Sequence, residues 1–177
     1  MDTFLTEKGF TQAQSIGIRL SKHMDDKSKY KFISSPLIRA KHTLQLIMEI
    51  LGVDYREVIE DSRLRSKNKG DFENLTSEEI IEKFPEELDM KGKDSWDWAY
   101  PNGGESRHDE YNRVFDFFNE YKSQDNLVIC AHEGVCCILI QLLENASEKE
   151  IKETKKCNNL DQNHFYMYTI EKGLERL

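Results

Sequence analysis

The chain has 177 residues, of which 38% are hydrophobic and 33% charged, so it can bury the core of one compact domain. We expect a single domain over residues 1–177. The formal net charge is −8 and no Lys/Arg stripe is present, which argues against a nucleic-acid partner. No run reaches the roughly 18 apolar residues of a membrane span, and no signal-peptide pattern opens the chain. We therefore expect no membrane partner and a cytoplasmic location.

The first third of the chain alternates helix and strand patterns. Apolar residues recur at helical spacing over residues 5–24, and Thr6 can cap the start of that helix. Residues 30–33 form a short strand. The tripeptide SSP after it supplies hydroxyl caps and a proline suited to a first helical turn. An apolar stripe over residues 37–51, closed by Gly52, predicts the helix that follows.

The remainder of the chain predicts further alternating elements after an irregular stretch. That stretch covers residues 54–104. The other predicted elements are a short capped helix at 75–84, a helix at 107–121, a strand at 127–130, a helix at 135–143 and a final strand at 164–170. Strands that alternate with helices indicate an α/β layered fold with a largely parallel sheet.

The four cysteines are expected to be small buried hydrophobic residues. Cys130, Cys136 and Cys137 lie in one apolar strand–helix unit, and two of them are adjacent. This spacing suits neither a disulfide framework nor a zinc site. We therefore predict no metal.

Two strand-to-helix corners carry polar residues that suit an anion. One presents Ser34, Ser35 and, one helical turn later, Arg39; the other presents His132. In parallel α/β folds, ligands collect at the carboxyl ends of the strands, where helix N-termini point backbone N–H groups at anions. An arginine fork matches phosphate geometry, and a histidine can donate to a phosphoryl oxygen. Together the two corners predict a phosphate site.

Four motifs in order carry a family resemblance. They are LTEKGFTQAQ, SSPLIRAKHT, GGES and VICAHEGV. This series resembles the histidine phosphatase superfamily, also called the phosphoglycerate mutase-like family, over residues 2–170, and four ordered motifs are far more specific than one. The resemblance implies a three-layer α/β sandwich of the phosphoglycerate mutase-like type.

The resemblance also implies roles for particular residues. Arg39 and His132 match the catalytic arginine and second histidine of the family's pocket. Ser35 stands at the first corner, and Glu105 and Ser106 match the loop at the rim, so these three are candidate substrate-binding residues. In the family, a first histidine takes the phosphoryl group from the substrate and then releases it to water or an acceptor, within a cationic clamp. This chemistry implies no metal and no other cofactor.

Three departures from the family pattern affect the chemistry. The family's first histidine stands in an Arg-His-Gly motif at the end of the first strand, and this sequence contains no such tripeptide. The missing segment would also supply a central strand, so its neighbours are expected to expose their edges. Ser66 stands where many members carry a glutamate acid, and serine is a poor proton donor. Glu133 replaces a usual glycine and is the other candidate acid.

Three functional hypotheses follow. The first is a phosphomonoesterase acting on a small phosphorylated metabolite through a phosphohistidine, impaired in this chain because the nucleophile is absent. The second is a non-catalytic domain that binds a phosphorylated ligand or protein. The third, less favoured, is a phosphoglycerate mutase. The expected partner is a small phosphorylated substrate or inorganic phosphate, and a homo-oligomer remains open.

Overall fold

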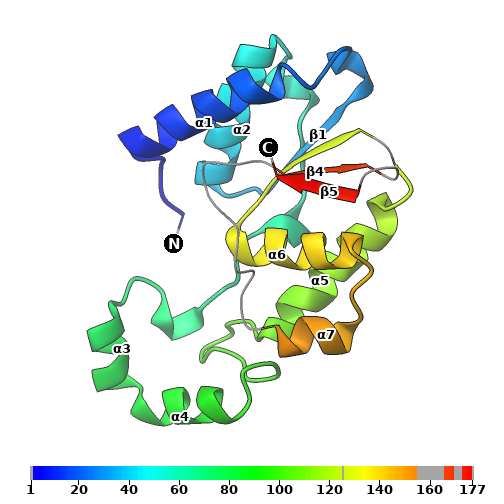
Figure 1. Ribbon diagram of the computed structural model, residues 1–177. Helices are drawn as coiled ribbons and strands as arrows, with labels where there is room; N and C mark the ends of the chain where they lie inside the picture. Colours follow the sequence, from blue (N-terminus) through cyan, green and yellow to red (C-terminus); the bar gives the residue numbers. More distant parts are fainter. Residues whose placement is uncertain (1, 125, 155–165, 170–172, 177) are drawn as a thin grey trace.

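A computed structural model describes residues 2–124, 126–154, 166–169 and 173–176 (Figure 1). Its centre is a parallel sheet of three strands, in the order β2 (Ile59–Glu60), β1 (Lys31–Ser34) and β3 (Leu127–Cys130). In the register, Ser34 pairs with Glu60 on one side and with Cys130 on the other. The carboxyl ends of all three strands therefore meet at one edge of the sheet.

Helices cover both faces of this sheet. Helices α1 (Glu7–Leu20) and α2 (Ile38–Leu51) lie on one face, and α5 (Arg107–Tyr121) and α6 (Glu133–Leu143) lie on the other (Figure 1). Successive residues of β1 point to opposite faces. Phe32 packs in the core cluster with α2, whereas Ile33 packs in the cluster with α5 and α6. This arrangement confirms the predicted three-layer α/β sandwich.

Several predicted helix ends are confirmed. The Thr6 hydroxyl accepts the Gly9 N–H at the start of α1, and Gly52 ends α2 with φ 70°. The proline of SSP is placed differently from the prediction. Helix α2 begins at Ile38 with Leu37 as its N-cap, because the Ser35 hydroxyl accepts the Leu37 N–H and holds a turn there. Pro36 therefore precedes the helix instead of occupying its first turn.

The segment between β2 and α5 forms a separate lobe. Its two helices, α3 (Ser77–Lys83) and α4 (Pro85–Lys93), project away from the sheet (Figure 1). Within the lobe, Phe72, Phe84, Trp98 and Tyr100 form an aromatic cluster. Short 3-10 helices occur at Lys27–Lys29, Tyr55–Glu57, Ser62–Leu64 and Gly70–Phe72. The lobe joins the body where Trp96 packs against His108 and Tyr111 of α5.

After α6 come α7 (Glu148–Glu153) and an antiparallel pair, β4 (Tyr166–Thr169) and β5 (Gly173–Arg176). The predicted final strand at 164–170 contains β4, and its remaining residues lie outside the described part. None of the described helices is long and apolar enough to cross a membrane.

The cysteines follow their prediction only in part. Cys130 and Cys136 are free, and burial raises the pKa of the Cys130 thiol to about 12. Cys137 is buried as predicted, but it is disulfide-bonded, so the expectation of no disulfide was wrong for this residue. Its neighbours in the sequence gave no sign of the bond, since a pairing depends on three-dimensional approach.

Candidate functional site

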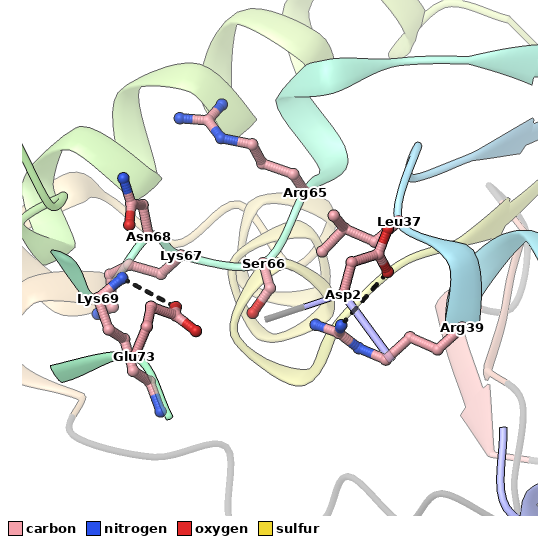
Figure 2. Close-up of a pocket in the computed structure, with 9 residues that line it drawn as sticks. All are labelled: Asp2, Leu37, Arg39, Arg65, Ser66, Lys67, Asn68, Lys69 and Glu73. Atoms are coloured by element: carbon pink, nitrogen blue, oxygen red, sulfur yellow. Dashed lines mark hydrogen bonds and ion pairs between the residues drawn. The ribbon is translucent and has the colours of Figure 1, made fainter. Parts of the chain in front are cut away.

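A pocket of about 320 Å³ lies at the edge of the sheet where the strands end (Figure 2). Its lining residues are Asp2, Leu37, Arg39, Arg65, Ser66, Lys67, Asn68, Lys69 and Glu73. Four of these side chains are basic and two are acidic. A chain with a net charge of −8 therefore carries a local excess of positive charge here, which favours an anionic ligand.

Arg39 enters the pocket from the first turn of α2, as predicted from the corner after β1. Its side chain keeps 28% of its surface exposed, and its Nη1 lies 4.0 Å from a carboxylate oxygen of Asp2. The guanidinium thus stands beside the N-terminus of a 14-residue helix, whose first backbone N–H groups also attract anions.

His132 follows β3 and forms the N-cap of α6. Its Nε2 lies 2.8 Å from the Ser35 hydroxyl, which links the two corners predicted to form the site. Burial, and then the charges of Arg39 and Arg113, lower the pKa of His132 to about 4. The ring is therefore neutral at pH 7, and the Ser35 O–H can donate to Nε2. His132 is not one of the described residues that line the pocket.

The two candidate acids lie in different places. Ser66 lines the pocket between Arg39 and the basic residues of the 67–69 loop (Figure 2). Glu133 is an exposed residue in the first turn of α6 and is not among the described pocket-lining residues. The general acid therefore stays a prediction.

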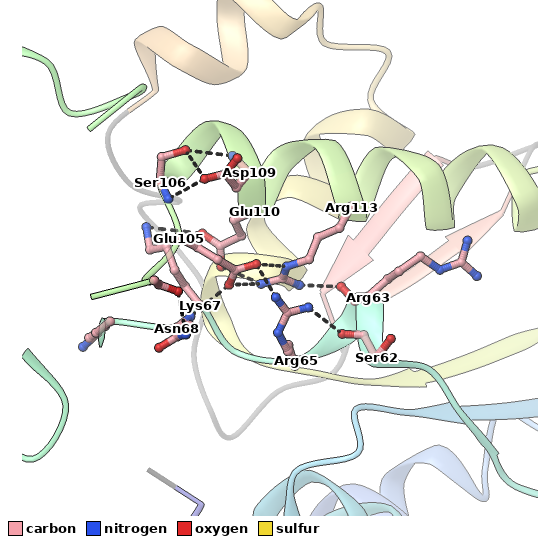
Figure 3. Close-up of polar contacts among 12 residues, drawn as sticks. Ser62, Arg63, Arg65, Lys67, Asn68, Glu105, Ser106, Asp109, Glu110 and Arg113 are labelled. Carbon is pink, nitrogen blue, oxygen red and sulfur yellow. Dashed lines mark hydrogen bonds and ion pairs between the residues drawn. The ribbon is translucent and has the colours of Figure 1, made fainter. Parts of the chain in front are cut away.

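Glu105 and Ser106, predicted at the rim, are not among the described residues that line the pocket, but Glu105 contacts Arg65 and Asn68, which are (Figure 3). Ser106 is buried and caps α5 in a capping box with Asp109. The Glu105 carboxylate accepts hydrogen bonds from Arg65 at 2.5 Å, from Arg113 at 2.9 Å and from the Asn68 backbone N–H at 2.9 Å. These contacts hold the 65–68 loop in place. A direct substrate contact by either residue stays a prediction.

Glu110 is a site residue that the sequence did not reveal. It is only 3% exposed, and its carboxylate lies 3.4 Å from Lys67, 3.6 Å from Arg107 and 4.0 Å from Arg113. It also lies against Gly134 in the first turn of α6. A glutamate three residues before an arginine suggests an ordinary surface pair on a helix, so no sequence signal indicated its burial.

The site brings together donors that suit an anion. Arg39 offers a planar fork, and the α2 N-terminus offers backbone donors. Two other histidines are engaged elsewhere: His42 packs on Phe4, and His108 contacts Asp97 and Glu148. The pocket therefore has the elements of a phosphate clamp, while the nucleophile expected from the family pattern is not in the sequence.

Comparison with known proteins agrees with this geometry. The sequence profile of the histidine phosphatase superfamily (branch 1) matches residues 1–175. The chain is 32% identical over 163 residues to a 2,3-bisphosphoglycerate-dependent phosphoglycerate mutase of Nitrobacter hamburgensis, covering 85% of this chain and 73% of that protein. This match and the profile cover both corners of the site.

Solved structures also resemble the fold of this chain. A mycobacterial glucosyl-3-phosphoglycerate phosphatase in complex with inorganic phosphate has a TM-score of 0.66 at 28% identity, over 83% of this chain and 72% of the other. A putative α-ribazole-5′-P phosphatase from Escherichia coli has a TM-score of 0.77 at 23% identity, over 94% of this chain and 77% of the other. With its ordered motifs, matching profile and shared fold, the chain belongs to the histidine phosphatase superfamily, branch 1.

Proposed function

We propose that the pocket binds the phosphoryl group of a small phosphorylated metabolite, and that the domain is built for phosphomonoester hydrolysis through a phosphohistidine. The observation that carries this proposal is the placement of Arg39 at the start of α2, in a pocket with four basic side chains beside His132. The names of its structural relatives, which include phosphatases and one complex with inorganic phosphate, support it.

We further propose that this chain is catalytically impaired. The covalent route needs a nucleophile placed in line with the leaving group, and the sequence contains no Arg-His-Gly. His132 contacts Ser35 through Nε2, which suits a clamp more than an attacking group. Ser66 in the pocket cannot protonate a leaving oxygen as a tuned carboxyl would.

The second candidate function is a non-catalytic domain that binds a phosphorylated ligand or protein. The observation that favours it is Ser66, because this residue lines the pocket at the place expected for the acid. Both functions require anion binding at Arg39 and differ in turnover. A mutase activity is less favoured, because it would need an additional segment to cap the substrate and this chain has only 177 residues.

Titration with inorganic phosphate tests the proposal. We expect Arg39→Ala to weaken phosphate binding about 10-fold or more, because a charge-assisted hydrogen bond contributes roughly 1.5–3 kcal/mol. A matched control is Arg56→Ala, since Arg56 is exposed and pairs locally with Asp54. Isothermal calorimetry on the three proteins gives the affinities. Equal phosphate affinity in Arg39→Ala and the unmodified chain would show that the anion site lies elsewhere.

A further inference from the structure

The Asp2 side chain lies at the start of α2. Leu37, the N-cap of this helix, provides no side-chain cap. Instead, the Asp2 carboxylate accepts the Ile38 backbone N–H at 2.7 Å. The same oxygen lies 4.0 Å from Nη1 of Arg39 (Figure 2). A carboxylate from a distant part of the chain thus sits where the helix N-terminus and the guanidinium converge.

These two groups are the donors that the proposed phosphate site offers. A carboxylate and a phosphate both present anionic oxygens, and both are favoured at a helix N-terminus and by an arginine fork. Asp2 is also a lining residue of the pocket. Its charge acts on His132 as well, where it opposes the effect of the two arginines on the histidine pKa. Asp2 and a bound phosphate would therefore compete for the same positive charge.

We propose that the Asp2 carboxylate is an internal occupant of the anion site, and that an incoming phosphate must displace it. This inference rests on the proposed function, because it assumes that phosphate binds beside Arg39. Asp2 then sets the affinity of the pocket, and only an anion that interacts more strongly with Arg39 and the Ile38 N–H replaces it.

The segment that carries Asp2 is largely exposed. Residues 2–6 have no regular secondary structure, and they precede the capped first turn of α1. Phe4 is 70% exposed, and its ring contacts His42 at a centroid distance of 5.5 Å. A segment with little buried apolar surface opens at low free-energy cost. Displacement of Asp2 therefore needs no rearrangement of the core.

Removing the charge of Asp2 should strengthen phosphate binding. When a site is open only part of the time, the apparent affinity falls by the open fraction, so Asp2→Asn should bind inorganic phosphate about 3–10-fold more tightly. Asparagine keeps an oxygen that can accept the Ile38 N–H, which protects the start of α2. Asp25→Asn is the matched control, because Asp25 is an exposed carboxylate outside the pocket.

Calorimetric titration of the unmodified chain, Asp2→Asn, Asp25→Asn and Asp2→Asn/Arg39→Ala gives the comparison. We expect a gain only in Asp2→Asn, and its loss in the double variant. In an NMR titration of the unmodified chain, the Ile38 amide should shift as phosphate replaces the carboxylate. Unchanged or weaker phosphate binding by a folded Asp2→Asn protein overturns this inference. A phosphate affinity that is unchanged in Arg39→Ala overturns the proposed function instead.

Discussion

The protonation state of His132 determines what this residue offers a phosphate. Its pKa of about 4 results first from burial and then from the charges of Arg39 and Arg113. At pH 7 the ring is neutral and contributes a hydrogen bond but no charge. A bound phosphate would place negative charge beside it, which favours the protonated ring and raises the histidine pKa. The positive charge of the pocket therefore comes from its arginines and lysines.

NMR titration of the His132 ring tests this state. We expect a midpoint near pH 4 in the free protein and a higher midpoint with saturating phosphate. Spectra of His23→Gln and His108→Gln would assign other histidine signals without changing a pocket-lining residue. A midpoint near the ordinary value of 6.5 in the free protein would mean that the ring is open to water.

The same pKa predicts how stability changes with pH. The pKa is about 6.5 in the unfolded chain and about 4 in the folded one, so only the unfolded chain takes up a proton between these values. The contribution of neutral His132 is therefore complete above pH 6.5 and is lost as the pH falls toward 4. We expect about 1–2 kcal/mol, less than the full shift implies, because the ring is partly open to solvent. Urea unfolding of the unmodified chain and of His132→Gln at several pH values measures this contribution as the difference between their free energies of unfolding.

Some of the site could be predicted from single residues, and some could not. Arg39 and His132 stand at strand-to-helix corners inside ordered motifs, so the sequence marks them. Asp2 gives no such signal, because its contact with Ile38 joins residues 36 positions apart. Glu110 is hidden for a related reason: its partners come from the 65–69 loop and from α6, and only the folded chain brings them together.

At the scale of elements, α5 is the support for the pocket wall. Glu105, just before the helix, binds Arg65 and the Asn68 N–H, while Glu110 in its first turn binds Lys67. The two carboxylates thus hold three residues of the same loop. Breaking a buried ion pair leaves an uncompensated charge, so these contacts fix the loop more strongly than surface pairs would.

A single added methyl group tests the contact between α5 and α6. A Cβ at position 134 would lie 2.7 Å from the Glu110 Oε1. This carboxylate is tied to basic side chains and cannot swing away freely, so we expect Gly134→Ala to destabilise the protein by about 1–3 kcal/mol. Gly92→Ala in α4 is the control, because nothing lies within 4 Å of its added Cβ. There the better helix propensity of alanine should be neutral or stabilising by up to about 1 kcal/mol. Urea unfolding measures both, and equal effects would show that Glu110 moves without cost.

The helices with strong local signals could be predicted, and the weaker elements could not. Helix α2 has an apolar stripe and a closing glycine, and α5 has a serine cap followed by an acidic residue at the third position. Helix α4 has no buried residue and hence no apolar periodicity. Strand β2 has two residues, both exposed, and forms only because β1 offers a pairing edge. Tertiary contacts determine whether such elements form.

At the scale of the whole molecule, β3 is the element that connects fold and chemistry. Its four apolar residues are all partly exposed, whereas Phe32 and Ile33 of the neighbouring β1 are buried. In the described sheet, β3 pairs only with β1. A further parallel strand along the other edge of β3 would end beside His132, because carboxyl ends of parallel strands meet at the same edge. This is where a strand ending in Arg-His-Gly would complete the site.

Turnover of small phosphoesters tests the functional claim as a whole. We expect the chain to hydrolyse them at or near the background rate, because the sequence has no Arg-His-Gly and Ser66 cannot replace a carboxylic acid. A form extended at its N-terminus by an apolar strand ending in Arg-His-Gly should gain activity, and His132→Ala in that form should remove most of it, about 100-fold or more. Phosphate release from a panel of small phosphoesters measures each protein, with Arg56→Ala as the matched control. Clear turnover by the unmodified chain that disappears in His132→Ala would instead show that His132 or Glu133 carries the chemistry, and that the chain is an active phosphatase by another route.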